Sequence, residues 1–253
     1  MKKVIAIANQ KGGIGKTTTA TSIAGILAER GYKTLLIDCD VQGNSTDTFR
    51  AKSDGVATLY DVMLEDSKPL TLNETIQHTE MGDIVASDPL LAEADPKLSI
   101  KGVKGLLKLK NAIDSLEGFD YVIIDTHPAI DFMLRNVLAA ADEVIIPVAP
   151  GRYSFQGLKP LIEAIDDATA LNPKLKIAGF LRTNFKDTNV SKDTSGALEE
   201  LEGIFDIHVF KTIIRQCTKV IEAQSARMTL IKYDKRCSTE HDYEDFVEEY
   251  LGE

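Results

Sequence analysis

The chain contains 253 residues, of which 43% are hydrophobic and 27% are charged. These proportions are ordinary for a globular protein and exclude intrinsically disordered, collagen-like and coiled-coil chains. The net charge of −10 argues against a protein that binds nucleic acid over its whole surface, and three scattered cysteines without a C-x-x-C pair argue against a disulfide framework or a structural zinc site.

Short apolar runs alternate with segments of helical period along the chain. In chain order we expect a strand at residues 4–8, a helix at 16–30, strands at 34–37 and 121–124, a helix at 129–140, a strand at 144–148, a helix at 156–171, a strand at 175–181, a helix at 192–203, a strand at 207–210 and a helix at 239–251. Several strands are continuous Val/Ile runs, which are typical of parallel sheets covered on both faces. The pattern therefore predicts the α/β class, with a doubly wound, mostly parallel sheet and helices on both faces.

The rest of the chain gives no sign of a second domain or of a membrane segment. Residues 47–80 are weakly periodic and are predicted to be loop with short helices. No repeat or Pro/Gly/Ser-rich linker interrupts the sequence, so we expect residues 1–253 to form a single domain. The apolar run at residues 4–8 is shorter than the roughly 7–15 residues of a secretory signal. No stretch approaches the ~18 apolar residues of a membrane span, so a cytoplasmic protein is expected.

A glycine-rich turn at residues 9–19 joins the first predicted strand to the first predicted helix. The strict G-x-x-x-x-G-K-[ST] pattern fails only at its first glycine, which is Gln10 here. Glycines let the backbone turn N–H groups toward phosphate oxygens, and the positive end of the following helix points to the same place. Lys16 supplies a charge for the β- and γ-phosphates, and the Thr17 hydroxyl suits Mg²⁺. The predicted nucleotide-binding residues of this loop are Lys11, Gly12, Gly13, Gly15, Lys16, Thr17 and Thr18.

The run from Lys11 to Thr18 resembles the deviant Walker A branch of the P-loop NTPases. The resemblance implies an ATP-dependent homodimer in which Lys11 reaches the phosphates bound by the partner. There it would neutralise charge that develops in phosphoryl transfer, as an arginine finger does. It also implies that Lys11 and Lys16 are catalytic and that ATP and Mg²⁺ are the cofactors.

Aspartates follow the strand predicted at residues 34–37. Ligands of such sheets bind outside the carboxyl ends of the strands, where Asp38 and Asp40 fall. One carboxylate at that place can orient or deprotonate an attacking water. Residues 38–44 are similar to the D-x-D-P-Q-G-N motif of ParA/Soj-type partition ATPases, with Val41 in place of Pro. By that resemblance Asp40 directs hydrolysis, and Asp38 is its neighbour at the strand end.

The strand predicted at residues 121–124 ends at Asp125, in the form of a Walker B motif. This carboxylate would hold the hydration shell of Mg²⁺, together with Thr17. Partition ATPases usually read D-x-P-P here, and His127 replaces the first Pro. A single histidine at such a place is more often structural than catalytic, so we assign His127 no chemical role.

Residues 184–187 are the candidate base-binding segment. They read Asn-Phe-Lys-Asp and differ from the guanine-binding N-K-x-D motif, because Phe185 stands where Lys is required. In ParA/Soj-type ATPases the residue after this strand contacts adenine, so the resemblance implies that Asn184 binds the base. A surface loop without that role is the alternative.

Basic residues are concentrated near the C-terminus. Residues 211–237 carry seven basic and two acidic side chains, whereas residues 238–253 carry seven acidic side chains and no Lys or Arg. Partition ATPases use basic residues in this region to bind DNA without sequence preference, so the resemblance implies phosphate contacts by Arg215, Lys219 and Arg227. The family's Ile-Pro-Arg-Asn run reads Ile-Arg-Gln-Cys at residues 214–217, which leaves a solvated basic surface as the alternative.

Two further charged segments have helical period. Lys97, Lys101, Lys104 and Lys108 follow the spacing of one helix face, which favours a solvated face over a second DNA surface. The helix at about 239–251 is acidic and amphipathic, with its apolar face made by Tyr243, Phe246, Val247, Tyr250 and Leu251 and acids on the other face. Anionic lipid would repel it, unlike the basic helix that ends MinD-type ATPases, so we expect it to pack on the core.

The resemblance to ParA/Soj-type ATPases covers nearly the whole chain, from the first strand to about residue 234. It implies a Mg²⁺-dependent ATPase for chromosome or plasmid partition, whose ATP-bound sandwich dimer binds DNA non-specifically and releases it on hydrolysis. It also implies stimulation by a centromere-binding ParB-like protein, and a nucleoid-associated state with ATP bound. Three alternatives stay open: a positioning ATPase for a non-DNA protein cargo, an ATP-dependent metabolic ligase, and a binding module without catalysis.

Overall fold

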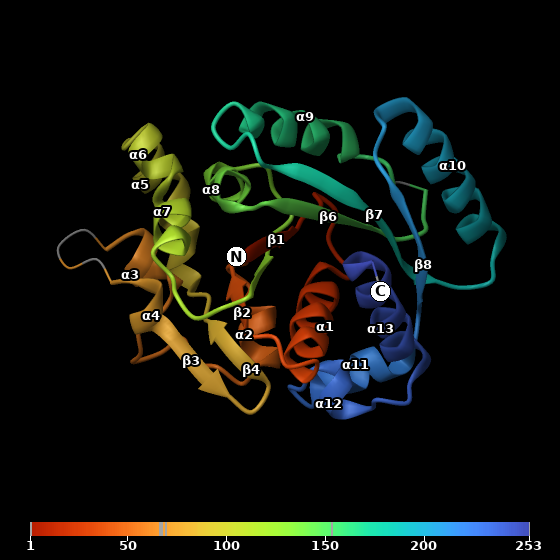
Figure 1. Cartoon of the computed structure of the whole chain (residues 1–253), viewed down its shortest axis with the longest axis horizontal. Helices are drawn as coiled ribbons and strands as arrows, with labels where there is room; N and C mark the ends of the chain where they lie inside the picture. Colours follow the sequence, from red (N-terminus) through yellow and green to blue (C-terminus); the bar gives the residue numbers. More distant parts are fainter. Residues whose placement is uncertain (1, 66–67, 69, 153, 253) are drawn as a thin grey trace.

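The computed structural model describes residues 2–65, 68, 70–152 and 154–252. Within these residues an eight-stranded sheet runs in the order β3-β4-β2-β5-β1-β6-β7-β8 (Figure 1). The strands are β1 (Lys3–Ile7), β2 (Thr34–Asp38), β3 (Ile76–Thr79), β4 (Gly82–Val85), β5 (Tyr121–Asp125), β6 (Glu143–Val148), β7 (Lys176–Phe185) and β8 (Val209–Arg215). Neighbouring strands are parallel except for the antiparallel pair β3 and β4. None of the helices in the described part of the chain has the length and apolarity to cross a membrane.

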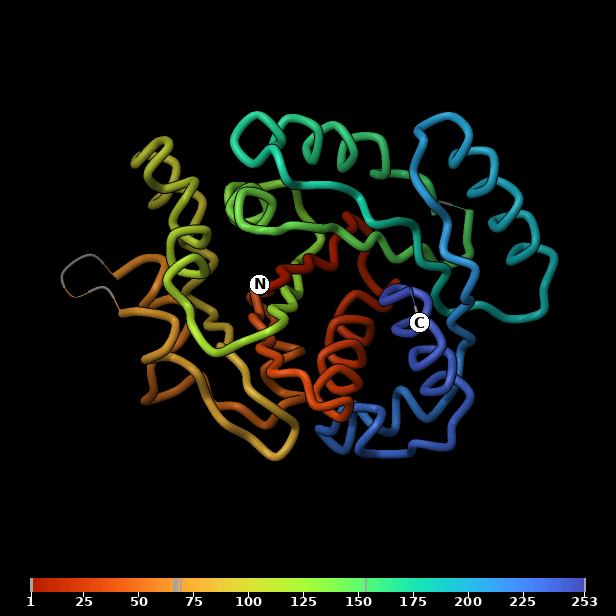
Figure 2. The backbone as a smooth tube through the Cα atoms, in the orientation of Figure 1, coloured from red at the N-terminus to blue at the C-terminus, as the bar shows by residue number. Residues whose placement is uncertain are grey.

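Helices cover both faces of the sheet, as Figure 1 shows. One face is packed by α3 (Leu59–Met63), α7 (Lys108–Asp114), α8 (Phe132–Ala140), α9 (Leu158–Thr169) and α10 (Asn189–Phe205). The other is packed by α1 (Lys16–Glu29), α11 (Thr218–Ser225), α12 (Leu230–Tyr233) and α13 (Ser238–Leu251). Successive β1 residues alternate between these cores, so Val4 faces the first and Ile5 the second. The predicted doubly wound α/β fold is confirmed, and Figure 2 shows the N-terminal strand in its middle.

Shorter elements connect these layers. They are α2 (Asn44–Thr48), α4 (Leu72–Thr75), the 3₁₀ helix η1 (Pro89–Glu93), α5 (Ala94–Ser99) and α6 (Val103–Leu106). The prediction of only loop and short helices at residues 47–80 misses β3, and residues 66, 67 and 69 lie outside the described part. The strand β4 was not predicted either. Both strands are four residues long, and their sequences, Ile-Gln-His-Thr and Gly-Asp-Ile-Val, lack the apolar run that marked the predicted strands. The last strand is also longer than predicted and ends at Arg215.

The prediction that the lysines at 97, 101, 104 and 108 share one face of a helix is wrong, because they do not lie on one helix. The chain turns between α5 and α6 at Gly102, whose φ of 56° is unfavourable for other residues. It then folds back so closely that a Cβ atom on Gly105 would lie 2.1 Å from the carbonyl oxygen of Leu98. The lysines are therefore divided among α5, the turn, α6 and α7.

The helix α13 packs against α1 and along the edge strand β8. Tyr243 is buried, and its hydroxyl lies 3.0 Å from that of Thr19 in α1. The helix packs on the core as expected, but the division into an apolar and an acidic face is incomplete, because Glu240 and Asp242 are also buried. Asp242 accepts a hydrogen bond from the Arg215 N–H, and Glu249 accepts from the N–H groups at 211 and 212. Acidic side chains thus cap backbone donors along the free edge of β8.

Candidate functional site

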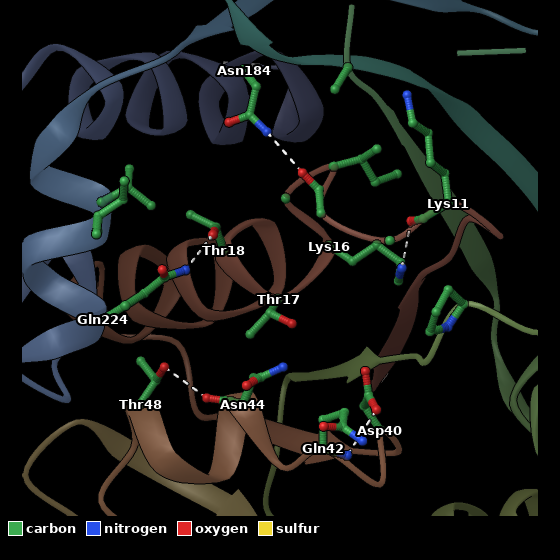
Figure 3. A pocket seen from close by; sticks show the side chains of 18 of the residues that line it. Lys11, Lys16, Thr17, Thr18, Asp40, Gln42, Asn44, Thr48, Asn184 and Gln224 are labelled. Carbon is green, nitrogen blue, oxygen red and sulfur yellow. Dashed lines mark hydrogen bonds between the residues drawn. The ribbon is translucent and has the colours of Figure 1, made fainter. Parts of the chain in front are cut away.

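The loop between β1 and α1 is curled around the ammonium group of Lys16. The left-handed φ angles of Gly13 (72°) and Gly15 (92°) turn the backbone there. Lys16 Nζ donates to the carbonyl oxygen of Lys11 over 3.1 Å, across the mouth of the loop (Figure 3). Burial lowers the pKa of Lys16, while the carboxylates of Asp125 and Asp40 act in the opposite direction. A buried cation therefore sits where the loop would meet phosphate.

A cavity of about 800 Å³ opens in front of this loop, a size that suits a small-molecule ligand. Its walls come from the phosphate loop, the segment after β2, the end of β7 and the helix α11. Of the predicted site residues, it is lined by Lys11, Gly12, Gly13, Gly15, Lys16, Thr17, Thr18, Asp40 and Asn184. Figure 3 shows Lys16, Thr17, Asp40 and Asn184 around this space, on separate elements of the chain. Segments far apart in the sequence thus form one site.

Two buried carboxylates lie side by side beneath the cavity. Asp38 ends β2 and is in register with Asp125, which ends β5. Asp38 accepts hydrogen bonds from the N–H of Asp40 (3.1 Å) and from the N–H and hydroxyl of Thr46 (2.8 and 2.7 Å). Burial raises the pKa of both carboxyls, and the charge of Asp125 adds to the shift at Asp38. Asp38 therefore holds the following segment in place and does not line the cavity.

Asp40 occupies the position between this carboxylate pair and the cavity. Its Oδ1 accepts the N–H of Gln42 at 3.0 Å, and its carbonyl accepts the hydroxyl of Ser87 at 2.6 Å. Only 7% of Asp40 is exposed, and it lines the cavity wall. A carboxylate fixed in this way can accept a proton from, or orient, a water molecule in the cavity.

The residues around Asp125 fit a hydrated magnesium ion. Asp125 Oδ2 accepts the Ser45 hydroxyl at 2.8 Å, whereas its Oδ1 is buried without a hydrogen-bond partner among the described residues. No group of three or more His, Cys, Asp or Glu side chains in the described ranges could hold a metal by itself. Mg²⁺ keeps several waters and takes few protein oxygens, so Thr17 and Asp125 suit it.

The far end of the cavity is lined by amide and aliphatic side chains. Asn184 has a left-handed φ of 57°, and its Nδ2 approaches the carbonyl oxygen of Gly13 at 3.5 Å. The hydroxyl of the preceding Thr183 donates to the Ile14 carbonyl at 2.7 Å and so ties β7 to the phosphate loop. From α11, Gln224 reaches the Thr18 hydroxyl at 3.4 Å. A planar base at this end would meet both polar and apolar contacts.

Comparisons with known proteins agree with this geometry. The AAA domain family matches residues 2–177 of the chain. The chromosome partitioning protein ParA of Myxococcus xanthus is 36% identical over 238 residues, which cover 92% of this chain and 82% of that protein. The sporulation initiation inhibitor protein Soj of Bacillus subtilis is 33% identical over 253 residues, which cover 98% of this chain and 98% of that protein. The chain belongs to the ParA/Soj family.

One of the solved structures to which this ParA/Soj-family chain is similar contains a nucleotide analog and magnesium. The structure of cobyrinic acid a,c-diamide synthase from Mycobacterium smegmatis, with a bound ATP analog and magnesium, matches with a TM-score of 0.83. It is 27% identical and covers 98% of this chain and 93% of its own. The fold around the cavity is therefore one that accommodates both ligands in a related structure.

Several cavity residues of this ParA/Soj-family chain were not predicted. They are Ile14, Gln42, Asn44, Asp47, Thr48, Pro128, Ala149, Pro150, Gln216, Val220, Ile221 and Gln224. Val220 and Gln224 are four residues apart on α11, so helical periodicity would have put them on one face, but not against the phosphate loop. Ser45, which binds Asp125, was also missed. The only indication in the sequence was that Ser45 directly follows the segment that is similar to the D-x-D-P-Q-G-N motif.

His127 has a structural contact in this ParA/Soj-family chain. Its Nε2 pairs with Asp131, which also caps α8 by accepting the N–H of Leu134 at 2.9 Å. Burial lowers the pKa of His127, but the Asp131 carboxylate outweighs it and the net shift is upward. The contact fixes the turn between β5 and α8.

The three predicted DNA-binding side chains each have an acidic neighbour. Arg215 pairs with Asp242 at 2.6 Å, and Lys219 and Arg227 pair at 2.7 Å with Glu222 and Asp47. All three cations remain substantially exposed, with 58%, 40% and 49% of their side-chain surface accessible. Their role in DNA binding therefore stays a prediction, and any phosphate contact would compete with these pairs.

Proposed function

We propose that this ParA/Soj-family chain is a Mg²⁺-dependent ATPase whose nucleotide state controls binding to DNA. One observation carries the proposal: Lys11, Lys16, Thr17, Asp40 and Asn184 all line the same cavity. The set provides phosphate binding, a carboxylate for water, and an amide for the base. A module that binds nucleotide without hydrolysing it would not need the carboxylate that acts on water.

Each side chain has a distinct role in the proposed reaction. Lys16 and the N–H groups at the start of α1 bind the phosphates and stabilise the negative charge of the transition state. Asp40 orients the attacking water and accepts its proton. Bound Mg²⁺ would neutralise phosphate charge, held by Thr17 and, through water, by Asp125. Asn184 donates to or accepts from the base.

The second lysine supports a dimer. In Figure 3 the Lys11 side chain extends away from Lys16. A Cβ atom on Gly151 would lie 3.4 Å from Lys11 Nζ, so this ammonium lies beside a neighbouring loop. We infer that two such single-domain chains join face to face on ATP. Lys11 of each would then reach the phosphates of the other.

The proposed dimer binds DNA through Arg215, Lys219 and Arg227 and releases it after hydrolysis. Contacts of this kind go to phosphates, so they confer no sequence preference. A centromere-binding ParB-like protein is the proposed stimulating partner, by family membership. The protein would then be cytoplasmic and would associate with the nucleoid in its ATP-bound form.

A metabolic ATP-dependent synthase is the second candidate. It is favoured by the similarity to the cobyrinic acid a,c-diamide synthase of Mycobacterium smegmatis. The partition function is preferred because the identity to ParA and Soj is higher, at 36% and 33% against 27%. ATP turnover that needs an added small-molecule acceptor would favour the synthase, and turnover stimulated by DNA and a partner protein would favour partition.

The decisive experiment measures binding to random-sequence duplex DNA with ATP, ADP or no nucleotide, across a salt series. Wild type and Asp40→Ala are compared, since the variant keeps the phosphate loop. We expect ATP-dependent binding that weakens steeply with salt and persists in Asp40→Ala. Dimerisation on ATP without DNA binding at low salt would overturn the DNA role and leave a non-DNA cargo as the alternative. Absence of ATP binding would overturn the whole proposal.

A further inference from the structure

The segment that carries Asp40 is fastened to α11 at its far end. Asp47, in α2, pairs with Arg227 through Oδ1 and Nε at 2.7 Å, and its carbonyl oxygen lies 3.3 Å from the same nitrogen. Arg50 forms the reciprocal contacts. Its Nε donates to the Arg227 carbonyl at 2.9 Å, and its Nη2 donates to the Ala226 carbonyl at 3.3 Å. We call these three residues, Asp47, Arg50 and Arg227, the clasp.

The backbone of the clasp is bent on both sides. Arg50 and Arg227 have φ angles of 55° and 53°, in the left-handed region that residues other than glycine rarely adopt. Each lies just beyond a helix end, after α2 and after α11 respectively. The guanidinium of Arg50 meets carbonyl groups that follow the last turn of α11, where a cation is favourable. Two unfavourable conformations that fit one another indicate a specific junction.

The clasp joins the nucleotide cavity to the basic surface. Asp47 lines the cavity wall, and α11 lines the facing wall with Val220, Ile221 and Gln224. The segment between Asp40 and Asp47 is tied by successive hydrogen bonds, from Gly43 N–H to the Asp40 carbonyl and from Asp47 N–H to the Gly43 carbonyl. Figure 2 shows the orange chain near residue 50 beside the blue chain near residue 227. A continuous series of contacts therefore connects Asp40 with Arg227.

We propose that the clasp is an autoinhibitory contact in which Asp47 competes with DNA phosphate for Arg227. This inference rests on the proposed function, because it assumes that Arg227 contacts DNA. While Asp47 holds the guanidinium, Arg227 contributes little to DNA binding. When nucleotide in the cavity displaces Asp47, the guanidinium is released to the phosphate backbone. The acidic residue thus makes DNA binding depend on nucleotide.

The test compares Asp47→Asn with Glu80→Gln, a matched control. Glu80 pairs with Arg50 at 3.2 Å, so its variant removes the same charge from the same junction without touching Arg227. DNA affinity and its salt slope are measured for each protein with ADP and with ATP. We expect Asp47→Asn to bind DNA roughly two- to fivefold more tightly with ADP, which is the range of an exposed ion pair. The salt slope should steepen by about 0.9, the value for one added phosphate contact.

Two further variants make the result specific to the pair. The double variant Asp47→Asn with Arg227→Ala should bind DNA as weakly as Arg227→Ala alone, because the released group is then absent. Asp47→Glu keeps the charge and should retain the wild-type dependence on nucleotide. Circular dichroism of each protein checks that it is folded.

The outcomes separate this inference from the proposed function. If wild type binds DNA with ATP but Asp47→Asn binds no more tightly than Glu80→Gln, the clasp proposal is overturned and the ATPase switch stands. If Asp47→Asn gains affinity even in the Arg227→Ala background, competition for Arg227 is likewise overturned. If wild type binds ATP and no DNA at any salt, the proposed DNA function fails and the clasp role fails with it.

Discussion

Arg215 and Asp242 form a bidentate ion pair that joins the last strand to the last helix. The guanidinium donates to both carboxylate oxygens over 2.6 to 3.0 Å, and Asp242 also accepts the Arg215 backbone N–H at 2.8 Å. Asp242 is almost fully buried, whereas 58% of the Arg215 side chain is exposed. The residue that sequence reasoning assigned to DNA is therefore also part of the packing of α13 on β8.

We predict that Asp242→Ala destabilises the fold by roughly 1–3 kcal/mol, because a backbone N–H and a guanidinium lose their acceptor. Urea unfolding measures the loss as a lower midpoint with an unchanged slope. Glu248→Gln is the control: its pair with Arg30 is exposed, and the expected effect is below about 0.5 kcal/mol. Equal losses in the two variants would contradict the structural role of Asp242.

Glu240 gives a pH-dependent prediction. Both of its carboxylate oxygens are buried without a partner among the described residues, and burial raises its pKa to about 8, with Glu244 adding to the shift. The folded chain then keeps a proton that the unfolded chain releases near pH 4.3. The stability linked to Glu240 is thus complete at low pH and is lost as pH rises toward 8, by at most about 1.4 kcal/mol per unit.

The variant Glu240→Gln removes this titration. Its free energy of unfolding, compared with wild type in urea at pH 5, 6, 7 and 8, should show an advantage that grows with pH. His241→Gln, at the neighbouring exposed position, is the control and should show the same pH dependence as wild type. A constant difference between wild type and Glu240→Gln would mean that Glu240 does not titrate in this range.

The two lysines of the phosphate loop should differ in their effects. Lys16→Ala is expected to weaken ATP binding roughly 10- to 100-fold, since charged hydrogen bonds are lost. Lys11→Ala should leave ATP binding by the monomer within a few fold but lower kcat by about 10³, the lower limit for an arginine finger. Titration with a fluorescent ATP analogue and steady-state hydrolysis measure the two effects. Identical phenotypes would show that Lys11 acts within its own chain.

Replacing either of two glycines by alanine should change the stability of the fold, in opposite directions at the two positions. Gly105→Ala should destabilise by about 1–3 kcal/mol, because its Cβ would lie 2.1 Å from the Leu98 carbonyl oxygen and the turn must move. Gly196→Ala lies within α10 with nothing inside 4 Å, so it should stabilise by roughly 0.5–1 kcal/mol. Thermal unfolding of both variants checks the order. A neutral Gly105→Ala would mean that the α5–α6 turn has no tight constraint.

The central parallel strands and the phosphate loop were predictable because their signals are local. The apolar run at Val4–Ile7 and the glycines before Lys16 define a strand, a turn and a helix without reference to the rest of the chain. The aspartates at 38 and 125 follow by rule, since each comes directly after such a strand. That these two are neighbours in register needed the sheet order, which sequence periodicity does not contain.

The features that were missed depend on tertiary contacts. The strand β3 has few apolar residues and forms an antiparallel pair with β4, and this hairpin could not be predicted from its composition. The break at Gly102 interrupts a lysine spacing that would suit a continuous helix. The acidic partners of Lys219 and Arg227 lie at different sequence separations, 3 and 180 residues, and only folding brings the second pair together.

The carboxylates of α13 also oppose self-association of the protein. Strand β8 ends the sheet, and an uncovered edge strand is a template on which another chain can add. Asp242 and Glu249 occupy three of its backbone donors, so an incoming strand would have to displace charged acceptors. A chain shortened before α13 would present β8 bare, with Phe210 and Ile214 stripped of their cover. We expect that fragment to aggregate by intermolecular sheet growth. In the intact fold the acidic helix hinders such growth.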